Sequence, residues 1–127
     1  MQLYGSLDTK TLAALGVEAL RLLCDGNIAD LADRFGYALT YQREPVRAIQ
    51  DDLNSCLAEL GATSLLPPLD STPKVKYFKP NDTGLLAVVE CLALTDKGTR
   101  VLVELIVAGS DVEKHVTLEG ISAVTIT

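Results

Sequence analysis

The segment AVVECLALTDKGTRVLVELIV, residues 87–107, limits the possible folds of this chain more than any other. Two runs of mostly apolar residues flank the turn-forming tripeptide Asp96-Lys97-Gly98. Apolar runs on either side of a short loop that contains glycine predict a β-hairpin with two long antiparallel strands. Each run also carries one carboxylate, Glu90 or Glu104. An acid in the middle of so apolar a strand needs a physical explanation.

The side chains of this hairpin divide between its two faces, because successive residues of a strand point to opposite sides. Odd-numbered positions are apolar throughout and predict the face on which helices pack. Both glutamates fall on the other, even-numbered face. If Gly98 adopts the left-handed conformation of a three-residue loop, Thr95 pairs with Thr99 and Glu90 lies directly opposite Glu104. In a register that differs by one residue, the two acids are diagonal neighbours instead.

Facing carboxylates destabilise a β-ladder unless something compensates them. Water, Arg100 or another cation, or a raised pKa could do so. Three interpretations of the even-numbered face stay open: a solvated sheet face, a subunit interface, and a catalytic carboxylate pair. The many leucines of this face speak against simple solvation. The interface interpretation involves Glu90, Leu92, Arg100, Leu102, Glu104 and Ile106.

The overall composition excludes several classes of protein. A net charge of −6 does not fit a nucleic-acid-binding domain, which is normally basic. The lysines at positions 74, 76 and 79 alternate with aromatic residues, and we interpret them as the guard of an edge strand. No segment is long and apolar enough to span a membrane, and the start of the chain does not read as a signal peptide. These features predict a cytoplasmic protein that binds neither nucleic acid nor membrane.

Two of the three cysteines, Cys56 and Cys91, predict buried free thiols rather than a metal site. Cys56 continues the apolar stripe of a helix and Cys91 lies inside an apolar strand, where free cysteine packs as a small hydrophobic residue. No pair of cysteines, and no cysteine with the single histidine, has the spacing of a zinc site. We therefore predict no metal ion and no cofactor.

The order of predicted elements defines the fold class. We expect one domain over residues 1–127, with a helical part at 6–61, a proline-broken loop at 62–73 and antiparallel strands at 74–127. Three helices are expected, the first capped by Ser6 or Asp8 and the third beginning at Pro45. A short strand is expected at residues 37–41, and the region 112–126 predicts either one strand bent at Gly120 or two strands. The fold class is α+β, with the three N-terminal helices packed on one face of the sheet.

This order of elements resembles the nuclear-transport-factor-two-like superfamily, whose fold is a cystatin-like cone. The resemblance rests on GNIADLADRFGYALTY, residues 26–41, followed by the helix start REPVRAIQ, residues 43–50. The positions that match the family pattern are Gly26, Ile28, Leu31, Ala32, Phe35, Glu44, Pro45, Val46 and Ile49. The resemblance implies a strongly curved sheet that wraps the helices, an apolar pocket inside the cone, and a homodimer formed by the outer face of the sheet.

The catalytic sites known in this superfamily have no convincing counterpart in the sequence. An acid is missing from the end of the short predicted strand, Leu39-Thr40-Tyr41-Gln42. The only histidine, His115, lies in a charged stretch where an exposed side chain is expected. General acid–base catalysis therefore has no evident pair, and we predict no catalytic residue. Phe35, Tyr37 and Tyr41 are the candidates for lining a ligand pocket, although ordinary half-buried residues would look the same.

Two hypotheses of function follow from the sequence. In the first, the chain is a homodimeric domain of this superfamily with an apolar pocket for a small molecule and without a catalytic set. In the second, it is an acidic interaction protein, of the immunity-protein or adaptor type, that binds a basic protein partner. The acidity, the small size and the lack of a reactive constellation motivate the second hypothesis.

Overall fold

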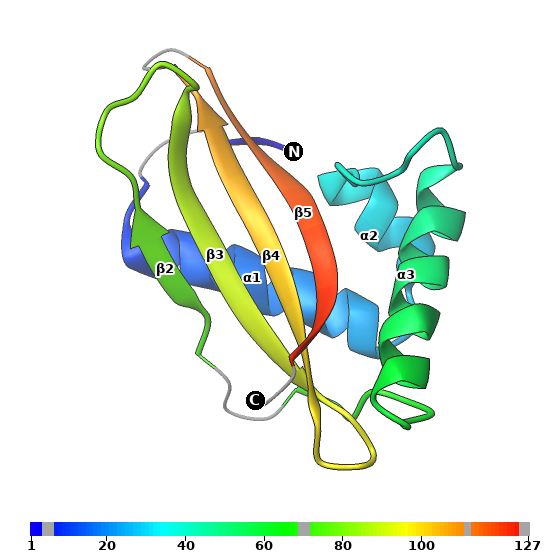
Figure 1. The fold of residues 1–127 in the computed structure, drawn as a ribbon. Coiled ribbons are helices and arrows are strands. Elements are labelled where there is room, and N and C mark those ends of the chain that lie inside the picture. Colours follow the sequence, from blue (N-terminus) through cyan, green and yellow to red (C-terminus); the bar gives the residue numbers. More distant parts are fainter. Residues whose placement is uncertain (4–6, 69–71, 111–112, 125–127) are drawn as a thin grey trace.

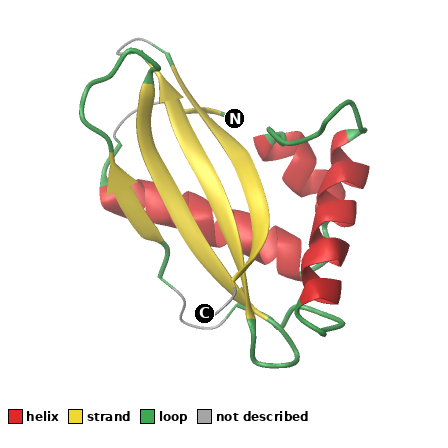
Figure 2. Ribbon diagram, viewed as in Figure 1, coloured by secondary structure: helices red, strands yellow, loops and turns green. Residues whose placement is uncertain are grey.

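The computed structural model of the protein describes residues 1–3, 7–68, 72–110 and 113–124. In these ranges a two-residue strand precedes three helices, and four further strands follow (Figures 1 and 2). The elements in chain order are β1 (Gln2–Leu3), α1 (Thr9–Cys24), α2 (Ile28–Phe35), α3 (Pro45–Glu59), β2 (Lys74–Tyr77), β3 (Leu85–Leu94), β4 (Arg100–Gly109) and β5 (Lys114–Val124).

The described strands form one antiparallel sheet in the order β1-β5-β4-β3-β2. Figure 1 shows the long strands β3, β4 and β5 curving in front of α1, with α2 and α3 beside β5. Helix α1 packs mainly against β3, and α3 packs against β5. The structure thus confirms an α+β fold in which three N-terminal helices cover one face of a curved antiparallel sheet. That face is called the inner face here, and the opposite one the outer face.

The helix ends follow from local chemistry. Asp8 caps α1, since its Oδ1 accepts a hydrogen bond from the backbone N–H of Thr11 at 2.7 Å. The carboxylate of Glu44 caps α3 by accepting from two backbone N–H groups at 3.1 Å each, and Pro45 occupies the first turn. Ser6, the other expected cap of α1, lies outside the described residues. These caps fix where the helices begin relative to the sheet.

The core lies between the inner face and the helices. Alternate residues of β3 and β4 are fully buried there, and Phe35 of α2 joins them at 1% exposure. The contact between α1 and β3 is very close at Gly16. A Cβ atom there would lie 2.8 Å from Cys91 Sγ and 2.9 Å from Val89 Cγ1, so only glycine allows this approach. Cys56 and Cys91 are buried free thiols, as the sequence predicted.

The structure differs from one of the two uncertain strand predictions and agrees with the other. The strand expected at residues 37–41 was wrong: only Tyr37 bridges to Leu118, and a turn follows. Tyr41 and Gln42 have positive φ values of 49° and 68°, which a strand does not allow. For the terminal region the sequence allowed one bent strand or two strands, and over the described residues the first is confirmed, because β5 is a single strand. It has an irregularity opposite the step from Glu104 to Leu105 that leaves one extra residue on β5.

Candidate interaction surface

The β3–β4 hairpin has the predicted register. The backbone N–H of Thr95 donates to the carbonyl oxygen of Thr99 at 2.8 Å, and Gly98 has a φ of 81°. Glu90 consequently lies directly opposite Glu104. The left-handed glycine suits the three-residue loop that gives this pairing. Two carboxylates therefore face each other on the outer face.

A row of charged residues crosses the outer face at this level. The register aligns Lys74 of β2 with Glu90, Glu90 with Glu104, and Glu104 with Gly120 of β5. Lys76 follows two residues after Lys74 on the same face, and Glu119 occupies the irregularity of β5. We call the set Lys74, Lys76, Glu90, Glu104 and Glu119 the charged row. It is basic at β2 and acidic from β3 to β5.

Two effects compensate the facing carboxylates. Lys76 Nζ lies 2.7 Å from Glu90 Oε1, an oxygen that is inaccessible to solvent. Burial raises the pKa of Glu104, the charges of Glu90 and Glu119 raise it further, and Lys76 opposes them. Of the expected compensations, a cation other than Arg100 and a raised pKa are therefore present. Arg100 pairs with Leu94 and Val124 at the hairpin end of the strands, away from Glu104.

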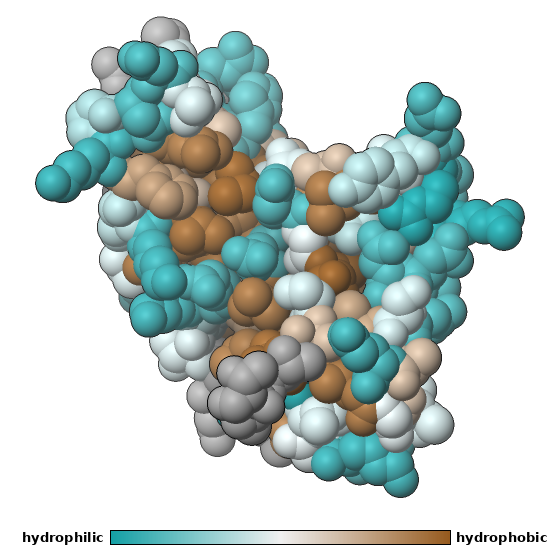
Figure 3. Space-filling view, viewed as in Figure 1, coloured by the Kyte–Doolittle hydropathy of each residue, from teal (hydrophilic) through white to brown (hydrophobic). Residues whose placement is uncertain are grey.

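Apolar side chains flank the charged row on both sides. Toward the hairpin loop, Leu92 and Leu94 are 39% and 46% exposed. In the other direction Val88 pairs with Ile106. Figure 3 views this face and shows hydrophobic side chains gathered over the strands and separated by hydrophilic ones. The structure places all of the candidate interface residues on this one face: Glu90, Leu92, Arg100, Leu102, Glu104 and Ile106.

The three candidate ligand residues do not gather around one cavity. Phe35 is part of the buried core, and Tyr41 is 76% exposed in the turn before α3. Tyr37 is buried, and its hydroxyl donates to Asp52 Oδ2 at 2.5 Å. Sequence reasoning had no means of bringing Tyr37 to Asp52, because the turn between them has no periodic pattern.

Arg43 organises this turn. Its guanidinium donates to Asp52 Oδ1 at 2.9 Å, to the Leu39 carbonyl at 2.8 Å and to the Thr40 carbonyl at 2.7 Å. Partial burial raises the pKa of Asp52, but hydrogen bonds from Arg43 and Tyr37 outweigh it and hold that pKa below its ordinary value. Burial and the bond to Asp52 raise the pKa of Tyr37. These hydrogen bonds tie the turn to α3, which is a structural role.

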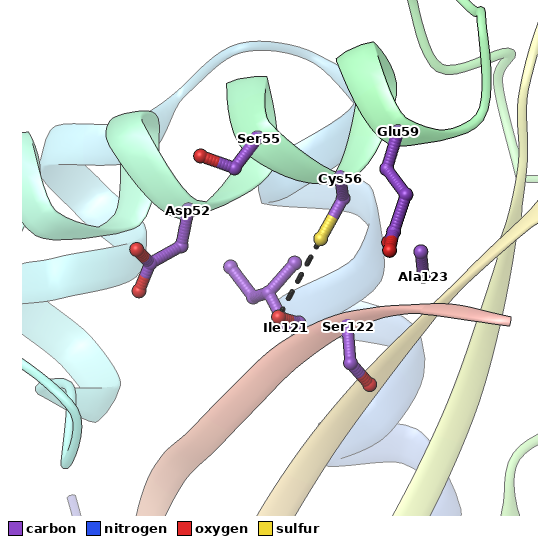
Figure 4. A pocket seen from close by; sticks show the side chains of 7 residues that line it. All are labelled: Asp52, Ser55, Cys56, Glu59, Ile121, Ser122 and Ala123. Carbon is purple, nitrogen blue, oxygen red and sulfur yellow. Dashed lines mark hydrogen bonds between the residues drawn. The ribbon is translucent and has the colours of Figure 1, made fainter.

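Among the described residues, open clefts lie on the helical side of the molecule. One, of about 470 Å³, separates α3 from β5 (Figure 4). Cys56 projects into it, but its thiol donates to the Ile121 carbonyl at 3.6 Å, and burial followed by the charges of Glu59 and Asp52 raises its pKa. A protonated thiol is a poor nucleophile. Another cleft, of about 360 Å³, lies between α2 and the start of α3. Neither cleft is lined by Phe35, Tyr37 or Tyr41.

The remaining candidates have ordinary surroundings. His115 is exposed, as predicted, and its Nε2 lies 3.2 Å from Glu113 Oε1. Strand β2 with its lysines is an edge strand, also as predicted. Within the described ranges, no group of three or more His, Cys, Asp or Glu side chains is placed to hold a metal ion, and no helix could cross a membrane.

Comparison with known proteins identifies no relative of this chain. No family model matches the chain, and no curated protein and no solved structure matches it either.

Proposed function

We propose that the chain is a non-catalytic protein-binding domain of the nuclear-transport-factor-two-like type, and that it forms a homodimer through the outer face of its sheet. One observation carries the proposal: the outer face exposes leucines beside a charged row. The order of elements and the curved sheet support the superfamily, whose outer sheet face commonly forms a dimer. The three free cysteines support a reducing, cytoplasmic location.

The balance of residues on the outer face favours an interface over simple solvation. Antiparallel sheets with one solvated face normally alternate apolar and polar residues. Here the outward positions of β3 and β4 include Val88, Leu92, Leu94, Leu102 and Ile106. An apolar area with polar groups inside it is typical of protein–protein contacts. The polar groups then define which partner fits.

The test is the solution mass of two variants that add the same charge at different places. Leu92→Glu puts a carboxylate into the apolar part of the outer face, and we expect it to convert a dimer into a monomer. Ala58→Glu, on the exposed side of α3, is the matched control and should leave the dimer intact. Light scattering coupled to size exclusion distinguishes the two states. Dimers in both variants would contradict the proposal.

A basic protein partner is the second candidate, and the net charge of −6 favours it. Such a partner would meet the same carboxylates, Glu104 and Glu119. It predicts that the wild-type chain is a monomer that captures a basic protein from its native host, and that Glu104→Lys abolishes the capture.

A small apolar ligand has less support, because Phe35 and Tyr37 belong to the buried core, whereas Tyr41 is exposed. It predicts that apolar compounds raise the melting temperature, by the linkage between binding and folding. An unchanged melting temperature over a panel of such compounds would count against it.

A further inference from the structure

The charged row is polarised across the sheet. Lys74 and Lys76 lie on β2 at one edge, whereas Glu104 lies on β4 and Glu119 on β5 toward the other. Lys74 is level with Glu104 along the strands, and Lys76 is level with Ile106. Glu119 lies between the residues paired with Glu104 and Leu105, and thus between the levels of the two lysines. The basic groups therefore stand at one edge of the outer face, and the acidic groups extend at matching heights from β3 through the middle strand β4 to β5.

Symmetry turns this polarity into a statement about how two copies meet. Two identical sheets that stack face to face can be related by a two-fold axis that runs along the strands or across them. An axis across the strands places β2 over β2 and β5 over β5, so lysines meet lysines and glutamates meet glutamates. An axis along the strands places β2 of each copy over the β4–β5 side of the other and preserves the height of every residue. Only the second arrangement brings opposite charges together, although it also places Glu90 over a carboxylate of the other copy at the centre of the face.

We propose that the partner of the outer face is a second copy of this chain, related by a two-fold axis parallel to the strands, so that Lys74 and Lys76 of each copy face Glu104 and Glu119 of the other. This arrangement rests on the proposed homodimer and defines its geometry. Stacked sheets lie about 10 Å apart, a distance that long lysine and glutamate side chains span together. The leucines beside the row supply the apolar contact, and the charges select the orientation.

Within one copy, burial and then the charges of Glu90 and Glu119 raise the pKa of Glu104 more than Lys76 lowers it. A lysine of a second copy would oppose that shift. Lys76 already contacts Glu90 within its own chain. Lys74, which is exposed on β2, is the cation best placed to reach across to the other copy.

Charge exchange tests the arrangement. Lys74→Glu and Glu119→Lys should each weaken the dimer by about tenfold at low salt, because each places like charges in contact twice per dimer. The double variant, Lys74→Glu with Glu119→Lys, should recover the wild-type dissociation constant to within about threefold. Lys10→Glu and Glu59→Lys make the same charge changes on α1 and α3 and should have no effect. The differences should shrink in about 0.5 M salt.

Mixing the double variant with the wild type sharpens the test. With the axis along the strands, the double variant pairs with itself and not with the wild type. With the axis across the strands, the glutamate introduced at position 74 would meet Lys74 of the wild type, and the mixed dimer would form instead. Single variants without effect, a double variant weaker than either single one, or a preferred mixed dimer would overturn the arrangement. A wild-type monomer would overturn the proposed function itself, which keeps the two failures distinct.

A second measurement needs no variant and so does not depend on whether the variants fold. A carbodiimide joins lysine and carboxylate side chains that are in contact, and a dimer mixed from ¹⁴N and ¹⁵N protein shows by mass which links join two copies. We expect links between copies from Lys74 or Lys76 to Glu104 or Glu119. Dimers in which these lysines link only within one copy would overturn the arrangement.

Discussion

The two faces of the sheet are built from the same strands and differ in almost everything else. On the inner face Val103 and Leu105 are inaccessible to solvent, and the β3 and β4 side chains there are all apolar. On the outer face Leu94 is 46% exposed, and charged side chains interrupt the apolar ones. Because neighbouring residues of one strand serve opposite faces, a single substitution can affect folding or association separately. The experiments below use this separation.

The largest expected effect is a deletion on the inner face. Leu105→Ala should lower the free energy of unfolding by about 2–5 kcal/mol, because it leaves a cavity in a closely packed core. Leu94→Ala should cost at most about 1 kcal/mol when the protein is dilute, since its side chain is already half exposed. Urea unfolding at two protein concentrations checks both values. The loss of unfolding free energy relative to the wild type should grow with protein concentration for Leu94→Ala only, because this substitution weakens the dimer. The same concentration dependence in both variants would contradict the distinction between the two faces.

A smaller effect is expected where α1 approaches the inner face. Gly16→Ala should destabilise the protein by about 1–3 kcal/mol through overpacking, although alanine is the better helix former. Cys91→Ala removes the sulfur atom nearest to a Cβ at position 16. The double variant should therefore lose less stability than the sum of the losses in the two single variants. Thermal unfolding of the wild type, the two single variants and the double variant gives the coupling energy between positions 16 and 91. A gain in stability from Gly16→Ala alone would show that the helix does not approach the strand this closely.

On the outer face, the loss of one ion pair should matter less. Lys76→Gln removes the cation beside Glu90 and should lower the free energy of unfolding by about 1 kcal/mol or less, because Lys76 is largely exposed. Lys79→Gln, just beyond β2, is the control. Urea unfolding at low and high salt compares them, and the Lys76 effect should be smaller at high salt. Identical curves for the two variants would mean that Lys76 does not compensate the carboxylates.

The pH dependence distinguishes the outer face from the turn before α3 and is the smallest effect. The folded pKa of Glu104 lies above its ordinary value of 4.5, so the folded state binds this proton more tightly than the unfolded state does. The stabilisation that this proton gives to the folded state is fully present below the ordinary pKa and is lost as the pH rises through the folded pKa. Glu104→Gln should abolish that loss. Asp52 behaves oppositely, because its folded pKa is lowered below 3.8. Its contribution is present above that value and is lost as the pH falls, which Asp52→Asn should remove.

Urea unfolding from about pH 3 to pH 7 measures how the free energy of unfolding changes with pH, and so measures the contributions of both Glu104 and Asp52. The variants Glu104→Gln and Asp52→Asn should differ from the wild type in opposite directions along this range. A wild-type slope that is unchanged in Glu104→Gln would assign the pH dependence to other groups.

Local chemistry made much of the fold predictable from the sequence. The loop glycine at position 98 indicated the hairpin register, and that register placed Glu90 opposite Glu104. Asp8 and Pro45 marked helix starts, and strict alternation divided the faces of β3 and β4. In each case the signal lies within a few residues of the structure that it determines.

The remainder depends on contacts between distant segments. The pairing of Lys76 with Glu90 requires the register of β2 on β3, and the turn residues of the loop between them, Pro80, Asn81 and Gly84, do not set that register by themselves. The expected strand at residues 37–41 failed because Arg43 draws the carbonyls of Leu39 and Thr40 into a turn. Strand β1 has two residues, too few for any periodicity. Propensity and pattern cannot report such tertiary pairings.

The central claim is that the outer face is a contact between two copies, and the solution mass of the wild-type chain tests it most directly. Light scattering coupled to size exclusion, at neutral pH and at about pH 5, gives that mass independently of shape. We predict a particle of twice the 13.6 kDa chain mass at neutral pH. The dimer should stay the same or weaken at the lower pH, because protonation of Glu104 removes a negative charge that faces the lysines of the other copy. A mass of 13.6 kDa at both values, over the full range of protein concentration, would contradict the account.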